Sequence, residues 1–469
     1  MHTQRSLLLA VLAAFTGVAL AAEEPAVPPA SDGPAMKGTA QAIPESNVYD
    51  LLTKSETTLS AIYYGRDRQD QTPGSNNGDI HVNALNLGLN FKSGYAWDHL
   101  GFDAAAHAAL RLNNGLGWSE VLYHDVNDKS DPSEEGRGKD KSTAVLSQAA
   151  LKFRQNADGQ GLSARLGYTP ISIGTMGTSG GLQSHAYRGF EGKYKFGDFE
   201  VGYGWADQFR NEWDNQFRDM TNKWHQNRAP YNDGSKIDYV HSLGLRYAPK
   251  NWFVDVGFGE GKDYRSNYQI AASYTWQLGA DSLTATGYYI GAKYKANGLY
   301  SLDGKKPIAD PKREWHASGS LSYTTGGLTL MGGYGTTHSP DSGEMNFRLT
   351  SWANSDNRNF IQTWGQLDDF VWDGTKVFKV GLSYDFGKVG VAGLSAGISA
   401  NFASGMKNGP NKADTKAEEI DFNVGYTVQS GFLKGASIGV YPAQLRTHGF
   451  SGKADRNDVK VIASYSKTF

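Results

Sequence analysis

The feature that most constrains this chain is a period-two alternation of apolar and polar residues from about residue 58 to the last residue. Segments of this kind are bounded by Gly, Asn, Asp and Pro, and about eighteen can be marked. They begin near Thr58, His81, Leu100, Thr143, Leu162, Ala186, Phe199, Asp238, Trp252, Ser266, Ser282, Glu314, Leu328, Lys376, Leu394, Glu419, Gly435 and Asp458. Such alternation predicts β-strands with one apolar and one polar face.

The connections between these segments alternate in length. Tight turns such as APKN, LGAD and TGG follow every second segment, and long polar stretches such as 211–236 and 337–375 follow the others. A soluble sandwich has no physical reason to sort its loops by length, whereas an outer-membrane barrel has short periplasmic turns and long extracellular loops. The sequence therefore predicts an all-β fold, a transmembrane antiparallel β-barrel of about 18 strands.

The polar face should line the lumen, because a barrel of about eighteen strands is too wide to be filled by side chains. The apolar face must then contact lipid, as Ile398 and Phe402 would, while Ser399 and Asn401 face water. Aromatic residues near the predicted strand ends suit an interfacial girdle. They are Tyr247, Tyr274, Trp276, Tyr384, Phe386 and Tyr465.

The N-terminal part differs from the rest. A basic start, an apolar run over 7–20 and an A-x-A site ending at Ala21 predict a signal peptide at 1–21 and export from the cytoplasm. Residues 22–57 are rich in Ala, Pro and Ser and predict a flexible periplasmic tail. The barrel is then predicted to occupy 58–469, in the outer membrane of a Gram-negative cell.

Other functional classes find little support. No helical membrane span follows the leader, and cysteine is absent. A net charge of -2 gives no reason to propose nucleic acid as a partner. GFGEGK at 257–262 lies in a strand with no helix after it, and Lys129 interrupts a calcium-like run. We predict no cofactor, no metal and no enzyme activity.

Basic residues on the polar face predict a wall that attracts anionic or strongly dipolar solutes. The residues assigned to this wall are Arg66, Arg68, Arg111, Arg165, Arg246 and Lys379. Further basic candidates are Arg154, Lys193, Lys195, Arg210, Lys293 and Lys460, and fewer acidic ones were found: Asp103, Glu191, Glu200, Asp255, Asp385 and Asp421. The alternative is that they are solvated wall residues that balance the mean charge.

Two long connections are candidates for narrowing the channel. The first spans 169–192 and has a Gly-rich, uncharged middle; the second spans 338–376. The residues assigned to the constriction and vestibule are Trp352, Trp364, Trp372, Asp368 and Asp369. Rings beside carboxylates suit sugars, which have apolar faces and hydroxyl edges. The alternative is that the Trp residues only hold the loop together.

The chain resembles the OprD-type outer-membrane porins, and within them the chitoporin-like branch, from about residue 58 to 469. The resemblance is carried by KIDYVHSLGLRYAPKNWFVDVGFGEGKDYRSNYQIAASYTW at 236–276, LDDFVWDGTKVFKVGLSYDFG at 367–387 and LSAIYYGRDRQD in the first strand. It implies an eighteen-stranded, mostly monomeric barrel with a basic ladder. It also implies passage of amino acids, small carboxylates or, in this branch, chitooligosaccharides.

One departure from the family pattern bears on the substrate. Carboxylate-taking members carry an Arg-Leu-Leu-Pro-type tract in the first inward loop, where this chain reads GGLQSHAYRGFEG, with Arg188 beyond that place and no Pro. The departure favours a sugar-type or broad substrate. A channel for amino acids or small carboxylates is the alternative, and a barrel enzyme or plugged adhesin is a third hypothesis.

The chain ends in DVKVIASYSKTF, whose alternation places Tyr465 and Phe469 on the apolar face. The last strand must pair with the first, because an open sheet edge cannot face lipid. A terminal Phe after alternating apolar residues also resembles the signal that barrel-assembly machinery reads. The predicted partners are therefore this machinery, outer-membrane lipid and lipopolysaccharide, and small solutes.

Overall fold

The alternating segments become antiparallel strands in a computed structural model of the chain. The residues that the structure describes are 46–70, 79–115, 119–124, 140–177, 182, 185–212, 214–221, 236–295, 309–341, 361–407, 415–449 and 455–469. Eighteen of the strands form a closed ring in which each pairs with its neighbour along the chain. The predicted fold class is confirmed.

Most strands of the ring are 10 to 15 residues long. The strands are β1 (Glu56–Asp70), β2 (Ile80–Lys92), β3 (Leu100–Arg111), β6 (Thr143–Arg154), β7 (Gly161–Thr169), β8 (Ala186–Phe196), β9 (Phe199–Arg210), β12 (Val240–Tyr247), β13 (Trp252–Gly261), β14 (Arg265–Leu278), β15 (Asp281–Tyr294), β16 (Arg313–Thr325), β17 (Leu328–His338), β18 (Lys376–Asp385), β19 (Leu394–Met406), β20 (Thr415–Thr427), β21 (Ser437–His448) and β22 (Arg456–Thr468).

Small elements decorate the ring. They are helix α1 (Asp50–Thr53), the pair β4 (Tyr123–His124) and β5 (Asp140–Lys141), β10 (Arg218–Thr221), β11 (Lys236–Ile237) and the 3-10 turn η1 (Phe386–Val389). In the part of the chain that the structure describes, no helix is long and apolar enough to cross a membrane.

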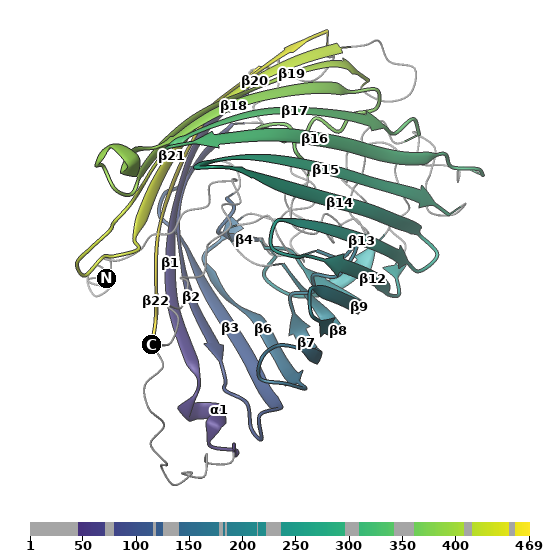
Figure 1. Ribbon diagram of the computed structural model, residues 1–469, viewed down its shortest axis with the longest axis vertical. Coiled ribbons are helices and arrows are strands. Elements are labelled where there is room, and N and C mark those ends of the chain that lie inside the picture. The colour runs from purple at the N-terminus through teal and green to yellow at the C-terminus, as the bar shows by residue number, and fades with distance from the viewer. Residues whose placement is uncertain are drawn as a thin grey trace.

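The ring closes where β22 pairs with β1, as predicted (Figure 1). The pairing runs from Thr58 opposite Thr468 to Asp70 opposite Arg456. The backbones of Thr57 and Phe469 extend it with two hydrogen bonds, at 3.2 and 2.9 Å. The first and last strands therefore leave no open edge toward lipid.

The strand starts agree with the sequence-based positions to within two residues, with one exception. We predicted the start of β20 near Glu419, but the strand begins four residues earlier, at Thr415. The charged run KAEE reads as loop in the sequence. In the structure it pairs with β19 and β21, and Ala417 packs with apolar residues inside the barrel.

The outward face is apolar, as predicted. Ile398 and Phe402 on β19 are 40% and 47% exposed, whereas Asn401 between them is fully buried. At the short-turn end the rings of two predicted girdle residues, Tyr274 and Trp276, lie 4.7 Å apart, and the ring of a third, Tyr247, lies 4.9 Å from that of Trp252, which was not predicted. These rings suit the membrane–water interface.

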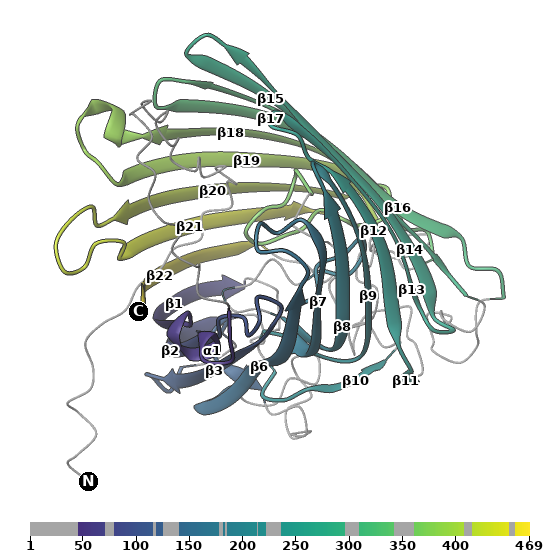
Figure 2. The same ribbon diagram turned by 60° about the horizontal axis from the view of Figure 1, so that its bottom comes forward.

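The predicted tail, 22–57, lies mostly outside the described residues, as does the predicted signal peptide, 1–21. Within 46–57 the structure shows order instead of a flexible tail. The Gly94 N–H donates to Leu51 O and the Ser46 hydroxyl donates to Tyr95 O, so α1 is held against the turn after β2. Figure 2 shows α1 beside the ends of β2 and β3. β1 then begins at Glu56, two residues before the predicted boundary.

The buried apolar residues do not form one central core. They form four clusters, each between the inner wall and a connection folded against it. One contains Ile171 and Met176, one contains Val121 and Leu122, and two contain residues of 361–372. The inner surface of the barrel is therefore shaped by three inward segments.

Candidate substrate pathway

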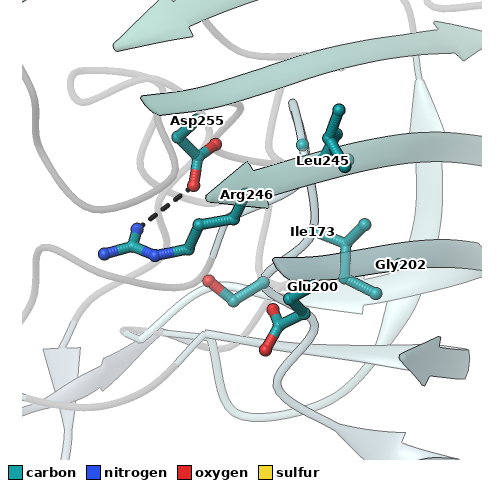
Figure 3. A pocket seen from close by; sticks show the side chains of 9 residues that line it. Ile173, Glu200, Gly202, Leu245, Arg246 and Asp255 are labelled. Atoms are coloured by element: carbon teal, nitrogen blue, oxygen red, sulfur yellow. Dashed lines mark hydrogen bonds and ion pairs between the residues drawn. The ribbon is translucent and has the colours of Figure 1, made fainter. Parts of the chain in front are cut away.

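The first inward segment, residues 170–177, follows β7 and lies on the inner wall of β9, β12 and β13 (Figure 3). A Cβ on Gly257 would lie 2.5 Å from Gly174 Cα, and one on Gly204 would lie 2.8 Å from Ile171 Cγ2. Such contacts are too short for real side chains, so glycine is what lets the segment rest directly on the strands. The strand glycines that contact this segment are Gly202, Gly204, Gly244, Gly257 and Gly259.

Polar and apolar contacts both fix this segment. The Thr175 N–H donates to Ser242 Oγ at 2.8 Å, and Gly174 adopts a positive φ of 52°, which glycine tolerates best. Ile171 and Met176 pack with Tyr187 and other buried residues. This connection is one of the two candidates for narrowing the channel, and its residues 170–177 lie against the inner wall.

Beside this turn a cavity of about 10 Å³ is lined by Arg246, Asp255 and Glu200, among others (Figure 3). Arg246 Nη1 lies 3.2 Å from Asp255 Oδ2, the pair marked by the dashed line. A cavity of this size holds about one water molecule. A solute must therefore pass on the lumen side of the segment, not beneath it.

The second inward segment, 361–373, reaches from β16 to β22. The Gln362 N–H donates to Ser318 Oγ at 3.1 Å, and the Gln366 amide nitrogen lies 3.2 Å from Asp458 Oδ2. The Lys379 ammonium donates to Trp364 O. The second candidate for narrowing the channel therefore also lies inside the barrel over residues 361–373.

Glu419 provides the most buried anchor of this segment. Its side chain is fully buried and its two carboxylate oxygens accept from the Leu367 and Asp368 N–H groups, at 2.7 and 3.0 Å. Gly365 has no side chain because a Cβ there would lie 2.4 Å from the same carboxylate. The turn at 365–368 is therefore built around one carboxylate from the wall.

A third inward segment, 119–123, was not predicted, because its connection reads only as long and charged. Val121, Leu122 and Tyr123 are buried against the wall of β1 to β3. Three consecutive large apolar residues in a polar connection are the signal that could have identified it. Glu120, in the same segment, lies 2.8 Å from Lys460 Nζ.

The electrostatics of Glu120 show how this segment is held. Burial alone would raise the pKa of its carboxyl, but Lys460 and Arg66 outweigh burial and the pKa is lowered. The carboxylate therefore stays ionised and bridges a cation from β22 and a cation from β1. The segment is tied to the closing seam of the barrel.

The family model for outer membrane porins of the OprD family matches residues 53–469. This chain belongs to the OprD family. A curated relative, chitoporin from Escherichia coli K12, is 27% identical over 436 residues, which cover 87% of this chain and 88% of the relative. This OprD-family barrel thus has a sequence relative along most of its length.

Solved structures share the fold. The crystal structure of Acinetobacter baumannii OccAB1 matches with a TM-score of 0.74 at 17% identity, covering 91% of this chain and 99% of that one. Pseudomonas aeruginosa OpdK, solved with vanillate, matches with a TM-score of 0.71 at 18% identity, covering 89% and 100%. At these identities the likeness concerns the barrel fold.

The six residues assigned to the basic wall all lie on the inward face of this OprD-family barrel, and three of them, Arg66, Arg165 and Arg246, are paired with carboxylates. Arg66 Nη2 lies 2.6 Å from Asp458 Oδ2, and Arg165 Nε lies 2.7 Å from Glu191 Oε1. Arg111 donates to the backbone carbonyl oxygens of Asn113 and Gly115. Arg68, in register with Asp458, faces the same side, and Lys379 and Arg246 are bound as described above.

Lys293, a further basic candidate for the lumen, lies on the outward face, so that assignment is wrong. Its neighbours Tyr294 and Ala292 are buried inside the barrel, and the next inward residues, Ile290 and Tyr288, pack beneath the second inward segment. Where an inward segment covers the wall, the inward face of the strand is apolar. The rule that polar residues of the alternation face the lumen does not hold there.

The residues assigned to the constriction have different surroundings. Trp352 lies outside the described residues. Trp372 is 6% exposed and packs with apolar residues, so its ring offers no open face to a sugar. Trp364 is half-buried and packs against another cluster, and Asp368 accepts from the Phe370 N–H at 2.7 Å. Only Asp369 among the described four is exposed. For Trp372 the alternative reading, holding the loop together, is the better one.

Neutral amides on the inner wall were missed. Asn267 and Gln269 on β14 are buried, and neither amide has a hydrogen-bond partner among the described residues. In register they lie beside Gly259 and Gly257, next to the tip of the first inward segment. The alternation places both amides on the polar face of the strand, but only charged residues of that face were assigned to the channel wall.

Replacing Glu419 by Ala is expected to loosen the second inward segment. Two buried N–H groups would lose their acceptor, at a cost of about 1–3 kcal/mol each. The current through single channels in a planar bilayer should become noisier and its mean should rise. Glu418→Ala is the matched control, because the neighbouring carboxylate is exposed on the outward face. Equal traces for both variants would show that Glu419 does not hold the segment.

Proposed function

We propose that this OprD-family chain is a porin that gives passive, substrate-selective diffusion of small hydrophilic solutes across the outer membrane. We propose further that chitooligosaccharides or related sugars are the preferred solutes. The closed ring of strands and the three inward segments support a narrowed, water-filled path. The wall would replace part of a solute's hydration with weak contacts, and the concentration gradient would drive passage.

The observation that carries the sugar preference is the pairing of the wall cations. Arg66, Arg165 and Arg246 each face a carboxylate at hydrogen-bond distance. A guanidinium that is already matched by an anion attracts a second anion weakly. The net field along these positions is therefore too small to favour carboxylate solutes strongly, which supports a neutral substrate.

The comparison with known proteins supports the same choice. The curated relative is named chitoporin, which favours chitooligosaccharides among the sugars. The solved relative that contains vanillate keeps the alternative open, a channel for amino acids or small carboxylates.

Solute block in a planar bilayer tests the substrate. Chitohexaose is expected to cause brief, concentration-dependent interruptions of the current, and benzoate at equal concentration is expected to cause none. Block by benzoate alone would reverse the assignment in favour of the carboxylate channel. The absence of any conductance from folded, inserted protein would contradict both channel readings and favour a barrel enzyme or a plugged adhesin.

The location and partners follow from the same proposal. The chain would be exported by its predicted signal peptide, be inserted by barrel-assembly machinery that reads Tyr465 and Phe469, and act as a monomer. The Tyr465 hydroxyl donates to Phe432 O, and Phe469 is 67% exposed at the end of the closing strand. The exposure of Phe469 supports its proposed recognition by the assembly machinery.

A further inference from the structure

A pocket of about 770 Å³ lies on the outward face at the long-loop end of β13 to β16. Three cations line it: Lys293, Lys295 and Arg313. Asp310 also lines it, and Lys295 Nζ is paired with Glu260 at 2.6 Å. By the porin arrangement, long loops lie outside the cell, so this pocket is at the level of the outer leaflet.

Lys293 and Arg313 are directly opposite each other across β15 and β16. Both are exposed, and neither forms an ion pair with any residue that the structure describes. Like charges at opposed positions of neighbouring strands are destabilising. An anion bound between the two side chains would turn this repulsion into attraction.

The row of residues just below the cations faces the membrane. Phe258, Tyr268 and Trp315 lie on the outward face, two residues further from the long-loop end than Glu260, Ser266 and Arg313. The Tyr289 ring lies 6.1 Å from that of Tyr268 and 6.2 Å from that of Trp315. An aromatic row of this kind marks the membrane–water interface. The cations stand about 7 Å above it, at the depth of lipid head groups.

We propose that this pocket binds the phosphorylated head group of an outer-leaflet glycolipid, with Lys293 and Arg313 contacting one phosphate. The aromatic row would contact the first part of the acyl chains. Arg offers two parallel N–H donors to a phosphate and Lys a compact charge, so the pair suits this anion. A lipid phosphate and free inorganic phosphate would make the same contacts with the two cations. The aromatic row, which would contact acyl chains, favours the lipid.

Native mass spectrometry of the full chain, delipidated in detergent, tests the proposal with bisphosphorylated lipid A as the probe. The wild type is expected to retain the lipid, and removal of the lipid phosphates should weaken retention. The double variant K293Q/R313Q should bind about tenfold more weakly, because hydrogen bonds to a charged phosphate are lost. The matched control K250Q/K434Q removes two positive charges from short turns at the opposite end and should bind as the wild type does.

Two further readouts separate the possible outcomes. In detergent without lipid, K293Q/R313Q should unfold at a slightly higher temperature than the wild type, because the like-charge repulsion is gone. Lipid A should raise the unfolding temperature of the wild type and not that of the variant. Equal lipid retention by both double variants would overturn the proposal. An equal effect of inorganic phosphate and lipid A would overturn it in favour of a free-anion site.

Discussion

Replacing Gly257 by Ala is expected to lower the single-channel conductance. The new Cβ would lie 2.5 Å from Gly174 Cα and 2.9 Å from Thr175 N, so it would meet backbone instead of a flexible side chain. Overpacking of this kind costs about 1–3 kcal/mol. The inward segment can relieve it only by moving away from the wall, and this movement narrows the water-filled path.

Conductance in a planar bilayer, measured on folded protein, checks this expectation. Gly381→Ala is the matched control, because Gly381 is also on the inward face and a Cβ there would have its nearest neighbour at 3.6 Å. The control should conduct as the wild type does. A Gly257→Ala channel with unchanged conductance and unchanged solute block would show that 170–177 does not limit flow.

Deletion of Phe469 is expected to reduce sharply the amount of folded barrel in the outer membrane. The deletion removes both backbone hydrogen bonds between Phe469 and Thr57, together with the exposed ring at the end of the chain. The barrels that do insert should conduct normally, because Phe469 lies on the outer side of the seam, away from the inward segments.

Electrophoretic mobility of unheated outer-membrane fractions reports the folded amount, and single-channel recording reports the function of the inserted fraction. Phe432→Ala is the control, because that side chain is 81% exposed in a short turn and lies outside the strands of the seam. If both variants assembled equally well, the terminal residue would have no special part in assembly. A change in conductance without a change in yield would also contradict the prediction.

The sequence predicts the wall of this barrel well, because period-two alternation and loop length are local properties. The eighteen strands and their order follow from them, and so does the closure of β22 on β1. What cannot be predicted locally is which parts of the inner face are covered. Lys293 was misassigned for this reason: Tyr288 and Ile290 face inward because the second inward segment covers them.

The contacts inside the channel could not be predicted from local sequence patterns either. Both long connections were candidates for narrowing the channel, but their contacts depend on residues far away in the sequence, such as Gly257 beneath Gly174 and Glu419 behind Leu367. The basic residues were assigned from the alternation along single strands, whereas the carboxylate partners of Arg66, Arg165 and Arg246 come from neighbouring strands. Arg66 and Asp458 are 392 residues apart. Charge pairing across strands therefore matches Arg66, Arg165 and Arg246 with carboxylates that local sequence patterns do not assign to them.

Asp458 connects the closing seam of the barrel to its interior. This one carboxylate, on the last strand, accepts from Arg66 of the first strand and from Gln366 of the second inward segment. Gln366 also donates to the carbonyl oxygen of Tyr441 on β21. Both acceptors of Gln366 lie on the last two strands, so the second inward segment can make these contacts only when β21 and β22 are in the wall. A change that opens the seam between β22 and β1 would therefore also disturb the interior of the channel.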